Sequence, residues 1–124
     1  MPGDDDFPSL GSLEAKIMRV TWEHADQFMS VRDVLGMLPG DPAYTTVMTV
    51  MNRLYEKGML RRRRDGRAWS YRPATSREAY AASTMREALH GARDHKAALL
   101  HFFADLAPDD AAALRRLVQD GDSS

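Results

Sequence analysis

The chain has 124 residues, of which 44% are hydrophobic and 28% are charged, and its formal net charge is −1 at pH 7. This length suits one domain, or one small domain with an appended helical arm. The absence of cysteine excludes disulfides, thiolate metal sites and cysteine nucleophiles. No apolar run is long enough to cross a bilayer, and the acidic start lacks the apolar core of a signal peptide. We therefore expect a cytoplasmic protein that does not insert into membranes.

Three helix-forming or flexible segments precede the clearest element of the sequence. Residues 1–9 are rich in proline, glycine and aspartate, which predicts a disordered leader. The apolar spacing over about 13–24 predicts a first helix. Ser30 followed by Asp33 indicates a capping box that opens a second helix. Residues 39–42 contain two prolines and a glycine, which end that helix.

The third helix has two distinct faces. Its core-facing positions are Val47, Val50, Met51 and Leu54. Its opposite face carries Thr45, Met48, Thr49, Asn52 and Tyr55. Thr45 or Thr46 can cap the first turn, because a hydroxyl accepts a hydrogen bond from an orphan backbone amide, and Gly58 suits a left-handed C-terminal cap. Two helices joined by a short Pro/Gly turn, the second with a polar outer face, are typical of a helix-turn-helix.

A basic hairpin is predicted directly after this helix. Asp65 and Gly66 form a strong two-residue turn signal, because both central positions need a positive φ, and strands are expected over 60–64 and 67–71. Between residues 53 and 72 the sequence has eight basic and two acidic residues. Local charge rather than the net sum sets the attraction for phosphate. The hairpin therefore predicts a DNA-binding wing.

Three amphipathic helices follow the proline that ends the hairpin. Thr75 with Glu78 indicates a capping box for the first of them, and Pro108 with two carboxylates behind it opens the last. Alone these helices would expose apolar stripes, so we expect them to interlock with a second copy. The alternative is that they fold back on their own winged domain. The predicted dimerisation residues are Met85, Leu89, Leu99, Phe102, Phe103, Leu106, Leu114 and Leu117.

The fold class that follows is mainly α with a small β-wing. Residues 10–73 are predicted to form a winged helix-turn-helix DNA-binding domain. Residues 74–119 are predicted to form a helical dimerisation domain, and residues 120–124 a disordered tail.

Four segments carry a resemblance to a known family: Glu14–Trp22, Tyr44–Gly58, Arg64–Tyr71 and Leu99–Phe103. In order, they resemble the opening helix, the recognition helix, the wing and the dimerisation arm of the penicillinase-repressor (BlaI/MecI) family. The resemblance covers roughly residues 9–118. It implies a homodimer that binds a palindromic operator in double-stranded DNA and represses transcription. In the best-known members the repressed genes confer β-lactam resistance; related members control copper or other regulons.

Other classes of function are less consistent with the residues. The cysteine-rich C-terminal motif of the copper-responsive relatives is absent. The sequence has no glycine-rich phosphate loop, no H-E-x-x-H and no G-x-S-x-G, so we expect no enzyme, no catalytic residue and no cofactor. The alternative to a repressor is a winged-helix module for protein interaction, or for architectural DNA binding without sequence-specific repression.

The predicted DNA-binding residues are Tyr44, Thr45, Thr46, Met48, Thr49, Asn52, Arg53, Arg63 and Arg67. Thr49 is assigned to base contact and Met48 to a thymine methyl group. Tyr44 is assigned to phosphate. At least one of Thr45 and Thr46 is assigned either to phosphate or to capping the helix. Asn52 either contacts phosphate or only faces solvent.

The arginines leave two further alternatives. Arg53 either binds phosphate or pairs with Glu56 one turn later. Strand alternation sends Arg61 and Arg63 to one face of the hairpin, and Arg62 and Arg64 to the other. They cannot all face DNA at once. Arg63 and Arg67 are assigned to phosphate, and the others to solvent.

The remaining aromatic residues are assigned to packing. Trp69 and Tyr71 are expected to pack the wing against the helices, and Trp22 to lie in the core.

The histidines of the arm do not predict a metal site. His90, His95 and His101 are five and six residues apart, not four, so they do not share a helical face as ligand pairs do. In well-studied relatives a membrane sensor-protease triggers cleavage of an Asn-Phe bond at this place. Here His101 and Phe102 occupy it, and they are the candidate cleavage site. A sensor-protease or its downstream protease is the corresponding candidate partner. Alternatively, Phe102 is simply a core residue of the arm.

Overall fold

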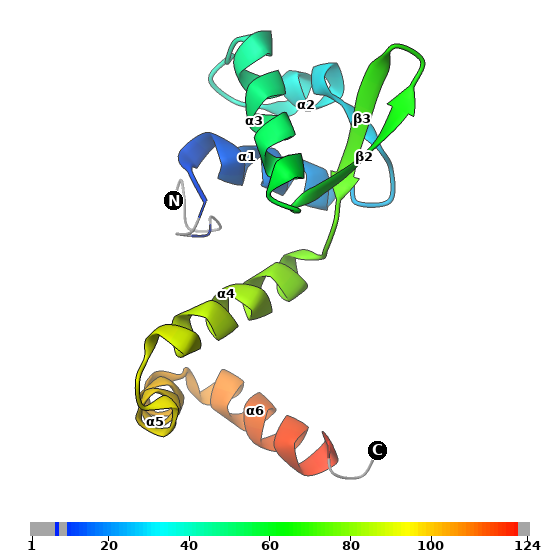
Figure 1. Cartoon of the computed structure of the whole chain (residues 1–124). Coiled ribbons are helices and arrows are strands. Elements are labelled where there is room, and N and C mark those ends of the chain that lie inside the picture. The colour runs from blue at the N-terminus through cyan, green and yellow to red at the C-terminus, as the bar shows by residue number, and fades with distance from the viewer. Residues whose placement is uncertain (1–6, 8–9, 122–124) are drawn as a thin grey trace. The chain divides into compact units, whose positions relative to one another are not determined.

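The computed structural model describes Phe7 and residues 10–121, and these residues form six helices and three strands (Figure 1). The elements in chain order are α1 (Ser12–Glu23), β1 (Met29–Ser30), α2 (Val31–Met37), α3 (Tyr44–Glu56), β2 (Leu60–Asp65), β3 (Ala68–Pro73), α4 (Arg77–Gly91), α5 (His95–Asp105) and α6 (Pro108–Gly121). The predicted fold class, mainly α with a small β-wing, is confirmed. The chain divides into two compact units, Met1–Thr84 and Met85–Ser124, so the division lies inside α4.

The first unit has a single apolar core beneath α3. The four core-facing positions predicted for this helix are all buried: Val47, Val50, Met51 and Leu54. They pack with Ile17 and Met18 of α1, with Val34 of α2 and with Leu60 at the start of the hairpin. Because helical spacing turns this stripe inward, the opposite face of α3 is left to solvent.

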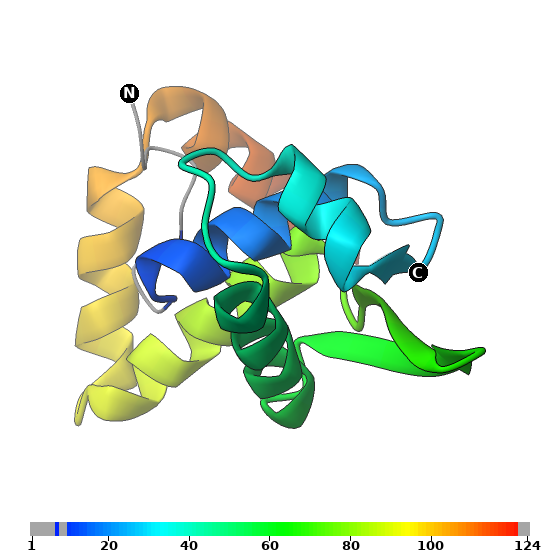
Figure 2. The same ribbon diagram turned by 90° about the horizontal axis from the view of Figure 1, so that it is seen from above.

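The sheet is antiparallel with strand order β1-β3-β2, and its long hairpin projects beyond the helices of this unit (Figure 2). The last pair of the ladder is Asp65 with Ala68, so the turn consists of Gly66 and Arg67. The predicted turn at Asp65 and Gly66 is therefore wrong by one residue. Gly66 has a φ of 68° and Arg67 has no positive φ. This pattern, with glycine first, is that of a type II′ turn, which matches the twist of the strands.

One predicted helix cap is confirmed and one is wrong. Ser30 Oγ accepts from the Asp33 amide at 3.0 Å, and Asp33 Oδ2 accepts from the Ser30 amide at 3.0 Å, which completes the capping box of α2. The N-cap of α3 is Ala43, so Thr45 and Thr46 lie inside the first turn and do not cap it. They are exposed, which frees both hydroxyls for a ligand.

The C-terminal end of α3 is as predicted, whereas the N-terminal end of α4 differs. Gly58 follows α3 with a φ of 82°, the left-handed cap that was predicted. The capping box predicted from Thr75 and Glu78 is wrong, because Ser76 Oγ accepts from the Ala79 amide at 3.0 Å. The cap is therefore one residue later than the sequence predicts.

An aromatic cluster joins α1 to the start of α4. Trp22 Nε1 donates to the Thr75 carbonyl at 3.0 Å, and the Trp22 and Tyr80 ring centroids are 6.0 Å apart. Phe7 meets both rings edge-on, at 5.8 Å from Trp22 and 4.9 Å from Tyr80. Phe7 was assigned to the disordered leader, but it packs here. The rest of the leader, residues 1–6 and 8–9, lies outside the described residues.

The second unit buries little of its apolar surface. Pro108 opens α6 with Asp109 and Asp110 in the first turn, as predicted. Among the described residues of this unit only Ala111 is buried. Its exposed large apolar side chains are Met85, Leu99, Leu100, Phe102, Leu117 and Val118. α6 continues to Gly121, so residues 120 and 121, assigned to the tail, are helical; residues 122–124 lie outside the described part.

Candidate nucleic-acid interface

The outer face of α3 presents polar and soft apolar side chains to solvent. Thr45, Thr46 and Thr49 are exposed, and Tyr44 and Met48 are 41% and 42% exposed. Apolar side chains on a helix of this size normally turn inward, and here the inward positions are already filled by the core stripe. The outer face therefore offers hydroxyl groups for hydrogen bonds and methyl groups for contact with thymine.

A groove of about 270 Å³ lies between α3, the start of α2 and the hairpin. Tyr44 and Met48 line it from α3, and Arg67 and Trp69 line it from the hairpin. Arg32 of α2 also lines it, with its guanidinium 5.4 Å from the Tyr44 ring. Two arginines beside an aromatic wall suit a phosphate that approaches along the surface. The structure thus brings three predicted residues together, namely Tyr44, Met48 and Arg67.

Arg32 is a candidate that the sequence analysis missed. It occupies the first turn of α2, two positions after the cap, where no motif marks it. Only the packing of α2 against the start of α3 places it beside Tyr44.

Arg62 clamps the hairpin to α3. Its guanidinium lies 4.0 Å from the Tyr55 ring centroid of α3 and 4.1 Å from the Trp69 ring centroid of β3. Arg62 Nη1 donates to Asn52 Oδ1 at 2.9 Å, and Asn52 Nδ2 donates to Glu56 Oε1 at 2.8 Å. Each stacking contact contributes about 0.5–2 kcal/mol, depending on how much water remains around it. Arg62 was assigned to solvent, and that prediction is wrong.

The clamp engages the side chain of Asn52 but not that of Arg53. Asn52 is half-buried and its amide is engaged on both sides by protein groups. Arg53 is exposed on α3, and Glu56 accepts from Asn52 rather than from Arg53. Arg53 therefore remains available to phosphate.

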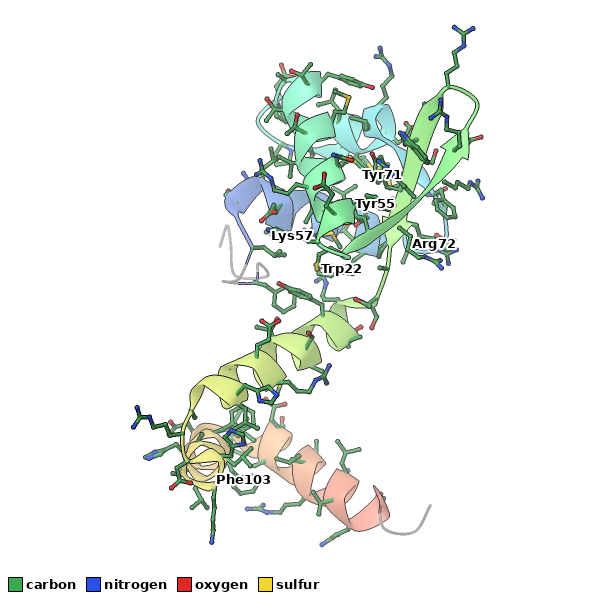
Figure 3. All side chains as sticks on the ribbon, viewed as in Figure 1. Trp22, Tyr55, Lys57, Tyr71, Arg72 and Phe103 are labelled. Carbon is green, nitrogen blue, oxygen red and sulfur yellow. The ribbon has the colours of Figure 1, made fainter. Side chains whose placement is uncertain are left out.

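The opposite face of the hairpin holds Arg63 and Arg72. The Arg63 guanidinium lies 4.2 Å from the Phe28 ring centroid, and that of Arg72 lies 5.8 Å from it. Arg72 Nε also donates to the Ala25 carbonyl at 2.8 Å. Tyr71, between α3 and the strands, and Arg72, on the outer side, point to opposite faces of the hairpin, and they pair with Arg62 and Arg61 respectively (Figure 3). The structure does not bring Arg63 together with the outer face of α3.

The packing roles predicted for Trp69 and Tyr71 are confirmed, whereas Trp22, predicted to lie in the core, is only partly buried. Tyr71 is 2% exposed and belongs to the core, while Trp69 and Trp22 are partly buried against it.

An ion pair fastens the end of α3 to the start of α1. Lys57 Nζ lies 2.8 Å from Glu14 Oε2, and the Glu14 side chain is only 10% exposed. The hydrogen bond from Lys57 lowers the pKa of Glu14 below its ordinary value of 4.5, and this effect outweighs the desolvation that raises it. The Gly11 amide adds a second donor at 3.0 Å. The C-terminal half of α3 is thus held on two sides, by Lys57 at its cap and by the clamp at Asn52 and Tyr55.

The histidines and carboxylates of the described residues do not form a metal site. Nowhere in residues 10–121 do three His, Asp or Glu side chains gather closely enough to hold a metal ion. His90 and His95 meet edge-on with centroids 6.0 Å apart. No helix in the described part of the chain is both long and apolar enough to cross a membrane.

Comparison with known proteins decides the family. The sequence matches the family described as Penicillinase repressor over residues 10–120. The chain belongs to the penicillinase-repressor family. It is 41% identical over 112 residues to the transcriptional regulator BlaI of Mycobacterium tuberculosis H37Rv, a match that covers 86% of this chain and 80% of that protein.

Two further likenesses agree with this assignment. The penicillinase repressor of Bacillus licheniformis is 28% identical over 69 residues, which cover 54% of this chain and about half (52%) of that protein. The solution structure of the DNA-binding domain of the repressor BlaI is similar with a TM-score of 0.51 at 27% identity, over 59% of this chain and 89% of that one. The predictions of the family, of a winged-helix DNA-binding repressor and of a non-enzymatic role are confirmed.

Proposed function

We propose that the chain acts as a homodimeric repressor that binds an inverted-repeat operator in double-stranded DNA, with one winged unit on each half-site. The observation that carries this proposal is the exposed face of α3 beside a groove lined by Arg32 and Arg67. A helix with this face fits the major groove, and arginines beside it neutralise the flanking phosphates.

The roles of the α3 residues follow from their positions. Thr49 contacts a base edge, and Met48 packs on a thymine methyl group. Thr45 and Thr46 lie in the first turn, where hydroxyls reach phosphate oxygens, and Tyr44 contacts phosphate beside Arg32. Asn52 is the weakest member of the predicted set, because its amide is already engaged.

Dimerisation belongs to the helical segment predicted over 74–119. Within it the second unit leaves Leu99 51% exposed and Leu117 68% exposed, while only Ala111 is buried among its described residues. Apolar surface of this extent is costly in water and is typical of an interface between copies. A two-fold dimer would also match the symmetry of an inverted repeat.

The regulated genes and the signal come from the family resemblance. We assign the chain to the cytoplasm, where it meets genomic DNA, and to a β-lactam-resistance or related regulon. Induction would involve a membrane sensor-protease or its downstream protease, with the His101–Phe102 bond as the candidate cleavage site. That bond lies inside α5, so α5 would have to unfold locally before a protease could cut it.

The test is a selection of genomic fragments by the purified full chain at moderate salt, followed by sequencing of the retained DNA. A short inverted repeat with half-sites about one helical turn apart would support the proposal. Retention without a common sequence would indicate an architectural DNA-binding module instead. No retention at any salt concentration would leave a protein-interaction module, because phosphate contacts always produce salt-dependent binding.

A further inference from the structure

Arg62 lies where the recognition helix and the wing meet, and it is enclosed on several sides. The guanidinium carbon lies 4.0 Å from the Tyr55 ring centroid and 4.1 Å from the Trp69 ring centroid. Its Nη1 is bonded to Asn52, and its Nε is buried without a hydrogen-bond partner among the described residues. These contacts leave few guanidinium atoms free to bind DNA, although Arg62 lies in the most basic stretch of the chain.

We propose that Arg62 is a positioning residue for sequence recognition. It fixes the angle between the hairpin and α3. The wing then contacts phosphate only when α3 lies deep enough in the major groove for its side chains to contact bases. This inference rests on the proposed function, because it concerns how the winged unit recognises its operator.

The position of the clamp along α3 supports this role. Asn52 is one turn after Thr49 and four residues after Met48, so it lies on the same outer face. The clamp therefore contacts α3 one turn after the residues proposed to contact bases. Arg62 pairs with Tyr71 across the hairpin, and Tyr71 is core, so the strand beneath the clamp is fixed. Only the outer part of the hairpin, toward Arg67, would swing if the clamp opened.

Arginine suits this position in a way that lysine does not. A planar guanidinium can stack between two rings and donate in its own plane at the same time. An ammonium group keeps the charge but cannot fill the slot between Tyr55 and Trp69. Arg62→Lys therefore separates geometry from charge. Arg61→Lys is the matched control, because Arg61 is the adjacent residue, is exposed, and points to the opposite face of the strand.

The experiment uses the full chain and two DNA duplexes. One carries a sequence selected by the wild-type protein, and the other has the same composition in scrambled order. We expect Arg62→Lys to lower the ratio of the two affinities on the order of tenfold, the usual size of coupling between contacting groups. The salt dependence on the scrambled duplex should not change, because the charge is kept. Arg61→Lys should leave the ratio as it is.

A double-mutant cycle tests the partner of the clamp. Asn52→Ala should reduce the affinity ratio in the wild-type background and have little further effect on Arg62→Lys, since both changes open one clamp. Additive losses would show that Asn52 contacts DNA by itself and would overturn the inference.

A measurement without DNA checks the geometry directly. A proton held between two aromatic rings experiences their ring currents, so the Arg62 Nε proton should resonate well upfield of the other arginines in the NMR spectrum. An unshifted signal, or an unchanged affinity ratio for folded Arg62→Lys, would overturn the inference. So would equal loss on both duplexes, which would make Arg62 an ordinary phosphate contact. A wild-type ratio of one would instead overturn the proposed function, while the proton signal still tests the clamp.

Discussion

Lys57 Nζ donates to Glu14 Oε2 at 2.8 Å, and this ion pair ties the last turn of the recognition helix to the first turn of α1. Glu14 is nearly buried, whereas Lys57 is 47% exposed, so water screens the pair from one side only. The carboxylate gains more from the pair than it loses through burial, which is why its pKa is lowered.

Glu14→Gln should lower the free energy of unfolding by about 1–2 kcal/mol at pH 7, the range for a charged hydrogen bond that is partly screened. Because the pKa of Glu14 is lowered in the folded state, its contribution is present above pH 4.5 and is lost as pH falls through the folded value. Urea denaturation at neutral and acidic pH measures the difference. Glu23→Gln, an exposed position on the same helix, is the control. A difference from wild type that stays constant down to acidic pH would contradict this assignment.

Gly58→Ala should destabilise the first unit by about 1–2 kcal/mol, because an L side chain is strained in the left-handed region. Gly58 has a φ of 82°, and a Cβ there would meet open space, so the backbone alone causes the cost. Gly36→Ala is the matched control, since Gly36 is helical with equally open surroundings. It should stabilise by about 0.5 kcal/mol. Changes of the same sign in thermal unfolding would argue against the backbone explanation.

Thr49→Val tests base contact on α3. Valine keeps the shape of threonine but lacks the hydroxyl, so preference for the selected sequence over scrambled DNA should fall about fivefold, the value of one hydrogen bond. Affinity for scrambled DNA should hardly change. If both affinities fell equally in a fluorescence-anisotropy titration, Thr49 would be a phosphate contact.

The two arginines assigned to phosphate can be compared directly. Arg67→Ala should weaken binding to every sequence and reduce the slope of log affinity against log salt by about one per half-site. Arg63→Ala was expected to do the same, but Arg63 rests on Phe28, on the face of the hairpin away from α3. Titrations over a range of salt concentrations measure both slopes. A slope that stays at the wild-type value for Arg63→Ala removes this residue from the interface.

Leu117→Glu should weaken the dimer at least tenfold, because it places a charge in apolar surface. Leu117 is 68% exposed within one chain, so the substitution does not disturb the folding of a single copy. Gln119→Glu adds the same charge to the same helix at an exposed polar position. Sedimentation equilibrium reports the monomer–dimer constant. Equal effects of the two substitutions would show that α6 does not form the interface.

Periodic patterns in the sequence predicted the fold because each is local. The core stripe of α3, the Ser30 capping box and the proline that opens α6 each depend on residues within one or two turns. Helix ends without such a signal were less predictable. The α3 cap was assigned to a threonine because threonine caps well, but the helix begins earlier, after Ala43.

The candidate site was predictable in outline and not in its details. Alternation along the hairpin correctly separated Arg61 and Arg63 from Arg62 and Arg64. It could not show which face meets α3, because that depends on how distant segments pack. Arg62 and Arg32 acquire their surroundings from Tyr55 and Tyr44 only after the chain has folded.

The clamp and the aromatic cluster place the two tryptophans of this chain in unlike surroundings. Trp69 lies under the guanidinium groups of Arg62 and Arg64, whereas Trp22 is hydrogen-bonded to Thr75 and packed on Tyr80. Indole emission depends on nearby charge and on hydrogen bonding, so the two should differ in wavelength and in quenching. The protein therefore has two intrinsic fluorescent reporters, Trp69 for the hairpin and Trp22 for the start of α4. Structural changes at the two places can be followed separately without an attached dye.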